Sequence, residues 1–369
     1  MKSNPLMKVK SLGQSIWLDY IQRDLLSSGE FQRLMNEDGV SGVTSNPAIL
    51  EKAIVAHHDY DDAIDAMQGS DANKIYEQLA IEDLQHAADL LSPQYEASQG
   101  QDGFVSFEVS PLLAHDTEAT VSEARRLWSA LDRPNSFIKV PATKAGIAAI
   151  SVLIAEGINI NATLLFSLQR YKEVAEAYIS GLEMRAKRGD SLTSVISVAS
   201  FFLSRIDTLV DTKLDELLAK SPSNQQQLIA LRGQSAIASA RLAYQDYKQL
   251  FTGERWQQLA AAGAKTQHLL WASTSAKDPA YSDIKYVEAL IGAETINTLP
   301  METLLAYRDH GEPAARLEHN IDTAQLTLKE LADIGLDLNV ITDQLEEEGV
   351  QKFIMAYTAL LKNLHQRID

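Results

Sequence analysis

The sequence contains no cysteine, which excludes disulfide bonds, thiol catalysis and thiolate metal sites together. Basic residues are few: 33 Lys and Arg against 50 Asp and Glu give a net charge of −17. This balance argues against nucleic acid or an anionic membrane as a partner, because both require a broad basic surface. The chain also lacks a stretch of about 18–20 apolar residues, which a membrane span needs, and an apolar secretory signal. Composition therefore predicts a soluble protein of the reducing cytoplasm.

Neither glycine-rich phosphate loop, GxGxxG or GxxxxGK[ST], occurs in the chain, which disfavours an open doubly wound sheet. Instead, eight short apolar segments alternate with longer amphipathic ones. Eight strands separated by helices are typical of the (β/α)8 TIM barrel, an α/β fold. The segments predicted as strands are 15–20, 40–47, 103–110, 136–143, 160–166, 193–200, 267–273 and 295–300.

Three stretches are longer than a minimal barrel requires. Residues 57–92 are predicted to form two extra helices, and residues 201–263 a long helical block with a break near 221–223. Residues 301–369 close the chain with further helices. Because no repeat, low-complexity tract or linker interrupts the chain, we expect residues 1–369 to form a single barrel domain with these helical additions.

One lysine is predicted to lie inside the barrel. Side chains alternate across a strand, and Lys139 lies mid-strand between Ile138 and Val140, at an enclosed position. Burial favours the neutral form of a lysine, an amine that attacks carbonyl groups. The alternative is a buried ion pair with Glu108 or Asp19 that only neutralises the charge of the lysine and has no catalytic role. Two inward carboxylates and the lack of another nucleophile favour the Schiff-base interpretation, in which these carboxylates transfer protons.

Polar residues collect toward the carboxyl ends of the predicted strands, where barrel enzymes keep their active sites. They are Asp19, Thr44, Asn46, Glu108, Lys139, Asn161, Thr163, Ser200, Ser273 and Thr274. A different cluster, His57 and His58 followed by Asp59, Asp61 and Asp62, has neither HExxH spacing nor an EF-hand glycine. We interpret that cluster as a solvated acidic helix face and expect no metal site.

Eight segments together resemble transaldolases of the longer bacterial type, members of the Schiff-base-forming class I aldolase superfamily. They are SIWLDYIQRDLL, GVTSNPAIL, VSFEVSP, FIKVPAT, GININATLLFS, VASFFLSRID, LLWAST and TINTLP, in family order over about residues 13–300. Residues 301–369 carry little motif content. The resemblance implies a barrel enzyme without a metal or organic cofactor, because the lysine imine itself is the electron sink.

The resemblance also implies roles for individual residues. Lys139 forms the Schiff base, Asp19 transfers the proton of aldol cleavage, and Glu108 works with a water and Thr163 in forming and hydrolysing the imine. The implied substrate-binding residues are Thr44, Asn46, Asn161, Ser200, Phe202, Arg205 and Lys277. Arg205 matches the family's phosphate-binding arginine. Lys277 stands where many transaldolases have a second arginine, and an ordinary loop lysine is the alternative there.

The implied reaction is transfer of a dihydroxyacetone unit from sedoheptulose 7-phosphate or fructose 6-phosphate to glyceraldehyde 3-phosphate or erythrose 4-phosphate. A fructose 6-phosphate aldolase is the alternative enzyme. In the family, a tyrosine at the position of Phe202 accompanies aldolase behaviour, and a phenylalanine accompanies transfer. A third interpretation is a catalytically silent sugar-phosphate-binding barrel, which would be expected to have lost the lysine or a carboxylate. The sequence leaves open whether the chain forms a homo-oligomer.

Overall fold

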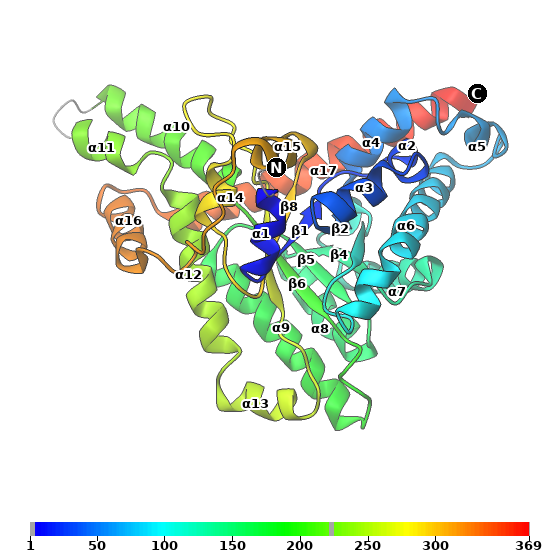
Figure 1. The fold of residues 1–369 in the computed structure, drawn as a ribbon, viewed down its shortest axis with the longest axis horizontal. Helices are drawn as coiled ribbons and strands as arrows, with labels where there is room; N and C mark the ends of the chain where they lie inside the picture. The colour runs from blue at the N-terminus through cyan, green and yellow to red at the C-terminus, as the bar shows by residue number, and fades with distance from the viewer. Residues whose placement is uncertain (1–3, 221–224, 369) are drawn as a thin grey trace.

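Eight parallel strands form a closed barrel in chain order in the computed structural model, which describes residues 4–220 and 225–368 (Figure 1). The strands are β1 (Gln14–Leu18), β2 (Val40–Thr44), β3 (Phe104–Glu108), β4 (Ser136–Pro141), β5 (Ile160–Leu165), β6 (Ser197–Phe202), β7 (His268–Ala272) and β8 (Thr295–Leu299). β1 pairs with β8, which closes the ring. The predicted fold class, an α/β TIM barrel, is confirmed.

Helices surround the barrel and extend beyond it (Figure 1). Up to β6 they are α1 (Pro5–Ser11), α2 (Arg23–Ser27), α3 (Glu30–Glu37), α4 (Pro47–Ala56), α5 (Asp61–Asp65), α6 (Ala72–Ala97), η1 (Pro111–Leu113), α7 (Thr117–Leu131), α8 (Lys144–Glu156) and α9 (Leu168–Lys187). After β6 they are α10 (Ser204–Lys220), α11 (Gln225–Leu231), α12 (Ser235–Leu250), α13 (Glu254–Ala261), α14 (Lys285–Ala289), α15 (Met301–His310), α16 (Ile321–Asp333) and α17 (Leu338–Ile368). In the part of the chain that the structure describes, no helix is both long and apolar enough to cross a membrane.

The sixth strand begins later than predicted. The sequence predicts a strand over 193–200 and helix from 201, but β6 runs over Ser197–Phe202 and α10 starts at Ser204. Pairing with β7 continues through this region, because the amides of Leu203 and Ser204 each donate at 3.0 Å to carbonyls of the β7 end. The predicted break near 221–223 lies within 221–224, outside the described residues.

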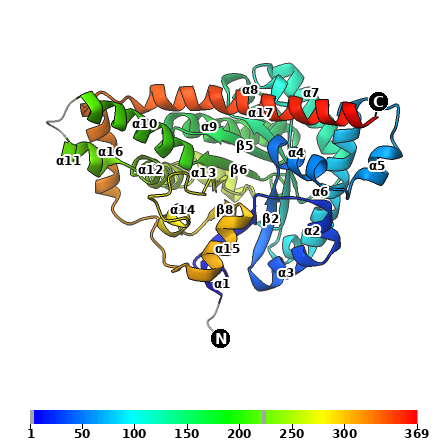
Figure 2. The same ribbon diagram turned by 90° about the horizontal axis from the view of Figure 1, so that it is seen from above.

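The C-terminal helix α17 crosses the mouth of the barrel. In Figure 2 it runs along most of the molecule, from the side of α10 and α16 to that of α4 and α5. It contacts α4, α6, α10 and β5, and Leu360 and Leu364 are fully buried. The tail of the chain is therefore part of the structure that encloses the carboxyl ends of the strands.

An aromatic cluster fills the barrel near the amino ends of the strands. The rings of Trp17, Phe104 and Phe137 lie 4.5–6.3 Å apart, centroid to centroid. Trp17 donates its indole N–H to Asp102 at 2.9 Å. Gly42 faces this tryptophan so closely that a Cβ would lie 2.5 Å from the indole ring. These rings fill the barrel interior below the carboxyl ends of the strands, where barrel enzymes keep their active sites.

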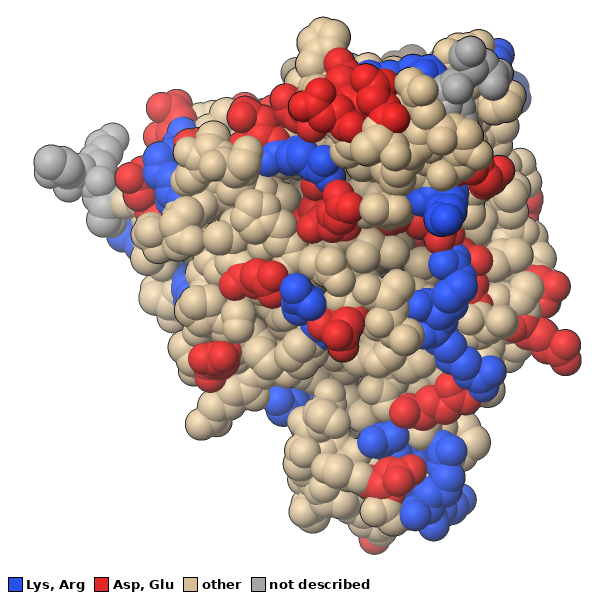
Figure 3. All heavy atoms as spheres, turned by 90° about the vertical axis from the view of Figure 1, so that its right-hand side faces the viewer, with Lys and Arg blue, Asp and Glu red and all other residues tan. Residues whose placement is uncertain are grey.

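Several ion pairs lie on the helical surface on the side of α6 and α7. In Figure 3 lysine and arginine side chains on this face are flanked by acidic ones. Arg126 binds Glu77 at 2.7 Å, and Arg133 binds Asp89 at 2.6 Å. Because their partners neutralise them, these arginines do not form a free basic surface.

Candidate active site

Strand alternation places the candidate catalytic groups one layer above the aromatic cluster. Lys139 is two residues beyond Phe137 on β4, and Asp19 is two residues beyond Trp17 at the end of β1. Glu108 ends β3 and lies directly opposite Lys139 in the strand register. Lys139 and Glu108 are 4% and 5% exposed. The period-two geometry of the strands thus brings one amine and two carboxylates to the same end of the barrel.

Lys139 is held between a backbone carbonyl and a carboxylate. Its Nζ donates to the carbonyl of Ser45 at 2.9 Å and lies 3.4 Å from Oε2 of Glu108. Neither oxygen of Glu108 accepts a hydrogen bond from the described residues. Burial raises the pKa of Glu108, and the charge of Lys139 opposes this rise. Glu108 can therefore both accept and return a proton beside the lysine.

Asp19 lies on the cavity wall and receives a defined hydrogen bond. The hydroxyl of Thr44 donates to Oδ1 of Asp19 at 2.6 Å and is 2.7 Å from the hydroxyl of Thr298. Burial raises the pKa of Asp19, whereas the Thr44 hydrogen bond and then the charge of Lys139 lower it. The two hydroxyls orient this carboxylate, which remains accessible from the cavity as a base.

The amides and hydroxyls of the site are oriented by their neighbours. Asn46 caps α4, since its Oδ1 accepts from the amides of residues 48 and 49 at 3.0 and 3.1 Å, which leaves its NH2 group for a ligand. Asn161 accepts from the hydroxyl of Ser200 at 2.7 Å and donates to Ser106 at 3.2 Å. The hydroxyl of Thr163 is buried and has no partner among the described residues.

Two cations lie at the β6 and β7 side of the cavity. Arg205 is the second residue of α10, and its guanidinium lies 5.5 Å from the ring centroid of Phe202. Its Nη1 is buried without a partner in the described chain, and burial lowers its pKa. Lys277 lies in the loop after β7, where it donates to Ser275 at 2.6 Å. A guanidinium with a free Nη1 among the described residues, at the start of a helix, is well suited to a phosphate.

These residues surround one cavity of about 360 Å³. The predicted residues that line it are Asp19, Thr44, Asn46, Lys139, Thr163, Ser200, Phe202, Arg205 and Lys277. Glu108 and Asn161 do not line it but lie behind it, in contact with Lys139 and Ser200. The arrangement combines a buried amine, proton-transfer groups and an anion-binding end in one space.

The family described as "Transaldolase/Fructose-6-phosphate aldolase" matches residues 16–364. The chain is 47% identical to Transaldolase 2 of Nostoc sp., covering all of this chain and 98% of that protein. It is 48% identical to the transaldolase of Thiobacillus denitrificans (96% and 98% covered) and 44% identical to that of Mycobacterium tuberculosis (99% and 98% covered). The chain belongs to the transaldolase family. Its full-length similarity identifies it as a transferase enzyme of this family.

Some residues that line this transaldolase cavity were not found from the sequence. They are Lys52 on α4, Thr298 at the end of β8, and Lys352 and Phe353 on α17. Thr298 sits in the TINTLP segment, and its inward strand position was a usable signal. No local signal marks Lys352 or Phe353, because their place depends on how α17 docks across the barrel mouth.

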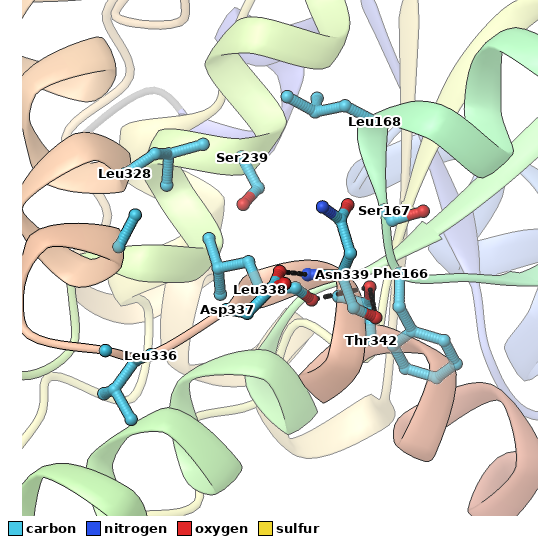
Figure 4. Close-up of a pocket in the computed structure, with 12 residues that line it drawn as sticks. Phe166, Ser167, Leu168, Ser239, Leu328, Leu336, Asp337, Leu338, Asn339 and Thr342 are labelled. Carbon is cyan, nitrogen blue, oxygen red and sulfur yellow. Dashed lines mark hydrogen bonds between the residues drawn. The ribbon is translucent and has the colours of Figure 1, made fainter.

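A second, larger cavity of about 480 Å³ adjoins the catalytic one (Figure 4). Figure 4 shows residues from the start of α9, from α12 and α16 and from the start of α17 around it. Phe166 lines it and contacts Phe202 of the catalytic cavity, with ring centroids 5.3 Å apart. Its charged lining residue is Asp337, so this cavity is unsuited to a sugar phosphate despite its size.

Proposed function

We propose that this transaldolase transfers a dihydroxyacetone unit from sedoheptulose 7-phosphate or fructose 6-phosphate to glyceraldehyde 3-phosphate or erythrose 4-phosphate, in the pentose phosphate pathway. The observation that carries the proposal is the buried Lys139 amine, 3.4 Å from Glu108, in a cavity that also holds Arg205, whose Nη1 has no partner among the described residues. The similarity to proteins named transaldolase over the full chain length supports it.

The reaction begins at Lys139. After a proton passes to Glu108 across the 3.4 Å gap, the neutral amine adds to the C2 carbonyl of the ketose. The carbinolamine then loses its hydroxyl as water, with the proton supplied by Glu108, and a C=N bond forms. Thr163 has an unpartnered hydroxyl on the wall of this cavity and holds the departing water. The same groups act in reverse when water releases the product.

Asp19 acts in cleavage and transfer. Its carboxylate takes the proton of the C4 hydroxyl, the C3–C4 bond breaks, and the bonding electrons move to the imine nitrogen as an enamine forms on Lys139. The aldehyde leaves and an acceptor aldehyde takes its place. The enamine carbon then attacks the new carbonyl carbon, and Asp19 returns the proton to the resulting alkoxide. Proton and electron counts therefore balance over the cycle without another reactant.

The remaining residues bind the substrate. Asn46 and Ser200 hydrogen-bond its hydroxyls from the cavity wall, Asn161 holds Ser200 in place from behind, and Thr44 keeps Asp19 oriented. Arg205 and Lys277 bind the phosphate group, which the donor and the acceptor each carry. Phe202 places an apolar ring beside the intermediate and has no hydroxyl to bring a proton to the enamine, which favours transfer over release of free dihydroxyacetone.

Trapping the intermediate tests this proposal. Borohydride reduction in the presence of fructose 6-phosphate is expected to attach a dihydroxyacetone unit to Lys139, as found by peptide mass analysis. Lys139→Ala is expected to abolish both adduct and activity and to keep the fold. Lys172→Ala, which removes a surface lysine paired with Asp246 on α12, is the control and is expected to label normally. Adduct on another lysine, or an active Lys139→Ala enzyme, would overturn the mechanism.

We also propose that the enzyme works in the cytoplasm, where free sugar phosphates occur. Its lack of cysteine agrees with a reducing compartment. Pull-down and fractionation of the tagged full chain from its own cells would test this placement, and enrichment in an extracellular or membrane fraction would contradict it.

A further inference from the structure

The loop that carries Lys277 is fastened to α10 by two buried aspartates. Asp207 and Asp211 lie one helical turn apart and are 1% and 5% exposed. One carboxylate oxygen of Asp207 accepts from Nζ of Lys285 and from the hydroxyl of Tyr286, both at 2.9 Å. Because unpaired buried carboxylates are costly, these contacts strongly favour one position of the segment after the loop.

Tyr281 provides a second attachment within the loop. Its hydroxyl donates to Oδ2 of Asp211 at 2.6 Å, and its ring lies 3.7 Å from Nζ of Lys285. The other oxygen of Asp211 accepts from the amide of Gly233 at 2.8 Å. Gly233 has a φ of +64°, and a Cβ there would lie 2.6 Å from both the Tyr281 ring and the Lys285 amine. Helix α10, the turn before α12 and the loop therefore pack as one unit.

The start of the loop is fastened to the same helix. The amide of Ser204 donates to the carbonyl of Ser273 at 3.0 Å, and their hydroxyls are 2.8 Å apart. Asp278 also lies 3.4 Å from the guanidinium of Arg232, which follows α11 and pairs with Asp215 of α10. Since Arg205 is in the first turn of α10, one helix carries the first phosphate cation and fixes both ends of the loop that carries the second.

The side chain of Lys277 borders two cavities. It lines the catalytic cavity and also a neighbouring cavity of about 240 Å³, which is lined by carboxylates including Asp215 and Asp278. Arg232 pairs with both of these carboxylates in the structure, and an exchange of partners would let the flexible Lys277 side chain bind there instead. A shift of the loop backbone toward the neighbouring cavity would move the amine away from the catalytic one.

We propose that Tyr281 is a positioning residue: through Asp211 it fixes the loop so that Lys277 stays at the phosphate end of the catalytic cavity, beside Arg205. This inference rests on the proposed function and assigns a role to the helical block after β6. It predicts that the Tyr281 hydroxyl affects phosphorylated substrates selectively, although Tyr281 lines the neighbouring cavity and not the catalytic one.

The test compares two acceptors in Tyr281→Phe, which keeps the ring beside Lys285 and removes the hydroxyl. KM for erythrose 4-phosphate and the inhibition constant of inorganic phosphate are expected to rise about three- to tenfold, because a charge-assisted phosphate contact is weakened. KM for unphosphorylated D-glyceraldehyde and kcat are expected to stay within about twofold. Tyr178→Phe is the matched control, since it removes a buried hydroxyl that donates at 2.6 Å to the carbonyl of Lys265.

Lys277→Ala separates this inference from the function on which it rests. If Lys277→Ala raises KM equally for both acceptors, Lys277 does not bind phosphate and its proposed role is wrong. If Lys277→Ala is selective but Tyr281→Phe is not, the positioning inference is overturned. In the double variant Tyr281→Phe is expected to add no further loss. An additive loss would show that Tyr281 acts independently of Lys277, and equal loss in Tyr178→Phe would show a general effect of stability.

Discussion

At the scale of single residues, the two carboxylates of the site differ in what holds them. Asp19 accepts a short hydrogen bond from Thr44, whereas Glu108 accepts none from the described residues and depends on Lys139 for compensation. Burial raises the pKa of both. This difference suits Asp19 to remain an ionised base and Glu108 to exchange protons with the lysine and with water.

Replacing Thr44 is therefore expected to change the acid side of the pH profile. In Thr44→Val the carboxylate of Asp19 loses the hydrogen bond that favours its ionised form, so its pKa rises further. Because the base form of a group with a higher pKa is lost sooner as pH falls, the acid limb of kcat/KM is expected to move to higher pH. A pH series of kcat/KM for fructose 6-phosphate measures this.

Thr342→Val is a suitable control for the threonine test, since this buried hydroxyl donates to the carbonyl of Leu338 in α17. It is expected to leave the acid limb unmoved. An acid limb that stays in place in Thr44→Val, or moves to lower pH, would show that Asp19 does not titrate as the base in that limb.

Phe202→Tyr is expected to lower transfer and raise the release of free dihydroxyacetone. The ring of Phe202 lines the catalytic cavity, and a phenol there can hydrogen-bond a water near the enamine and so help to protonate it. Both activities and the melting temperature should be measured on one preparation. If the melting temperature falls while the ratio of the two activities is unchanged, the added hydroxyl only destabilises the packing against Phe166 and does not affect the reaction.

At the scale of elements, the strands were predictable because their alternation and order are local features of the sequence. The same alternation predicted that Lys139 faces inward, and the structure places it there. The shifted start of β6 was not predictable, since the extension through Phe202 depends on pairing with β7. The docking of α17 depends on contacts with α4, α6 and α10, distant in sequence, so Lys352 could not be assigned to the site.

The contribution of α17 to the site is expected to be electrostatic. Lys352 lines the cavity but is 51% exposed and lies 3.5 Å from Glu348. Lys352→Ala is therefore expected to lower kcat/KM for erythrose 4-phosphate by about two- to fivefold at low salt, and by less at 0.5 M KCl. Lys329→Ala on α16, an exposed lysine outside this cavity, is expected to change neither value. Equal losses at low and high salt would contradict an electrostatic role.

At the scale of the whole molecule, we propose that the barrel and its helical additions form one domain. Residues of α6, α12, α16 and α17 belong to the same hydrophobic cluster as the barrel strands. A chain with a net charge of −17 also needs its cations concentrated where anionic substrates bind, and the cavity gathers Lys52, Arg205, Lys277 and Lys352 from distant parts of the chain. Lys352 reaches the cavity because the C-terminal helix α17 packs on the barrel.

Paired substitutions on α17 test whether the tail shares the stability of the barrel. Leu360 is fully buried and Met355 is 63% exposed on the same helix. Leu360→Ala is expected to lower the free energy of unfolding by about 2–5 kcal/mol, and Met355→Ala by less than about 0.5 kcal/mol. Two readouts are followed during heating: the helical circular dichroism signal and the ability of Lys139 to form the borohydride-trapped adduct. If the chain is one domain, Leu360→Ala is expected to lower the midpoint temperature of both losses together. A separate early transition, in which helix signal falls while Lys139 still forms the adduct, would show that α17 melts independently of the barrel and that the single-domain proposal is wrong.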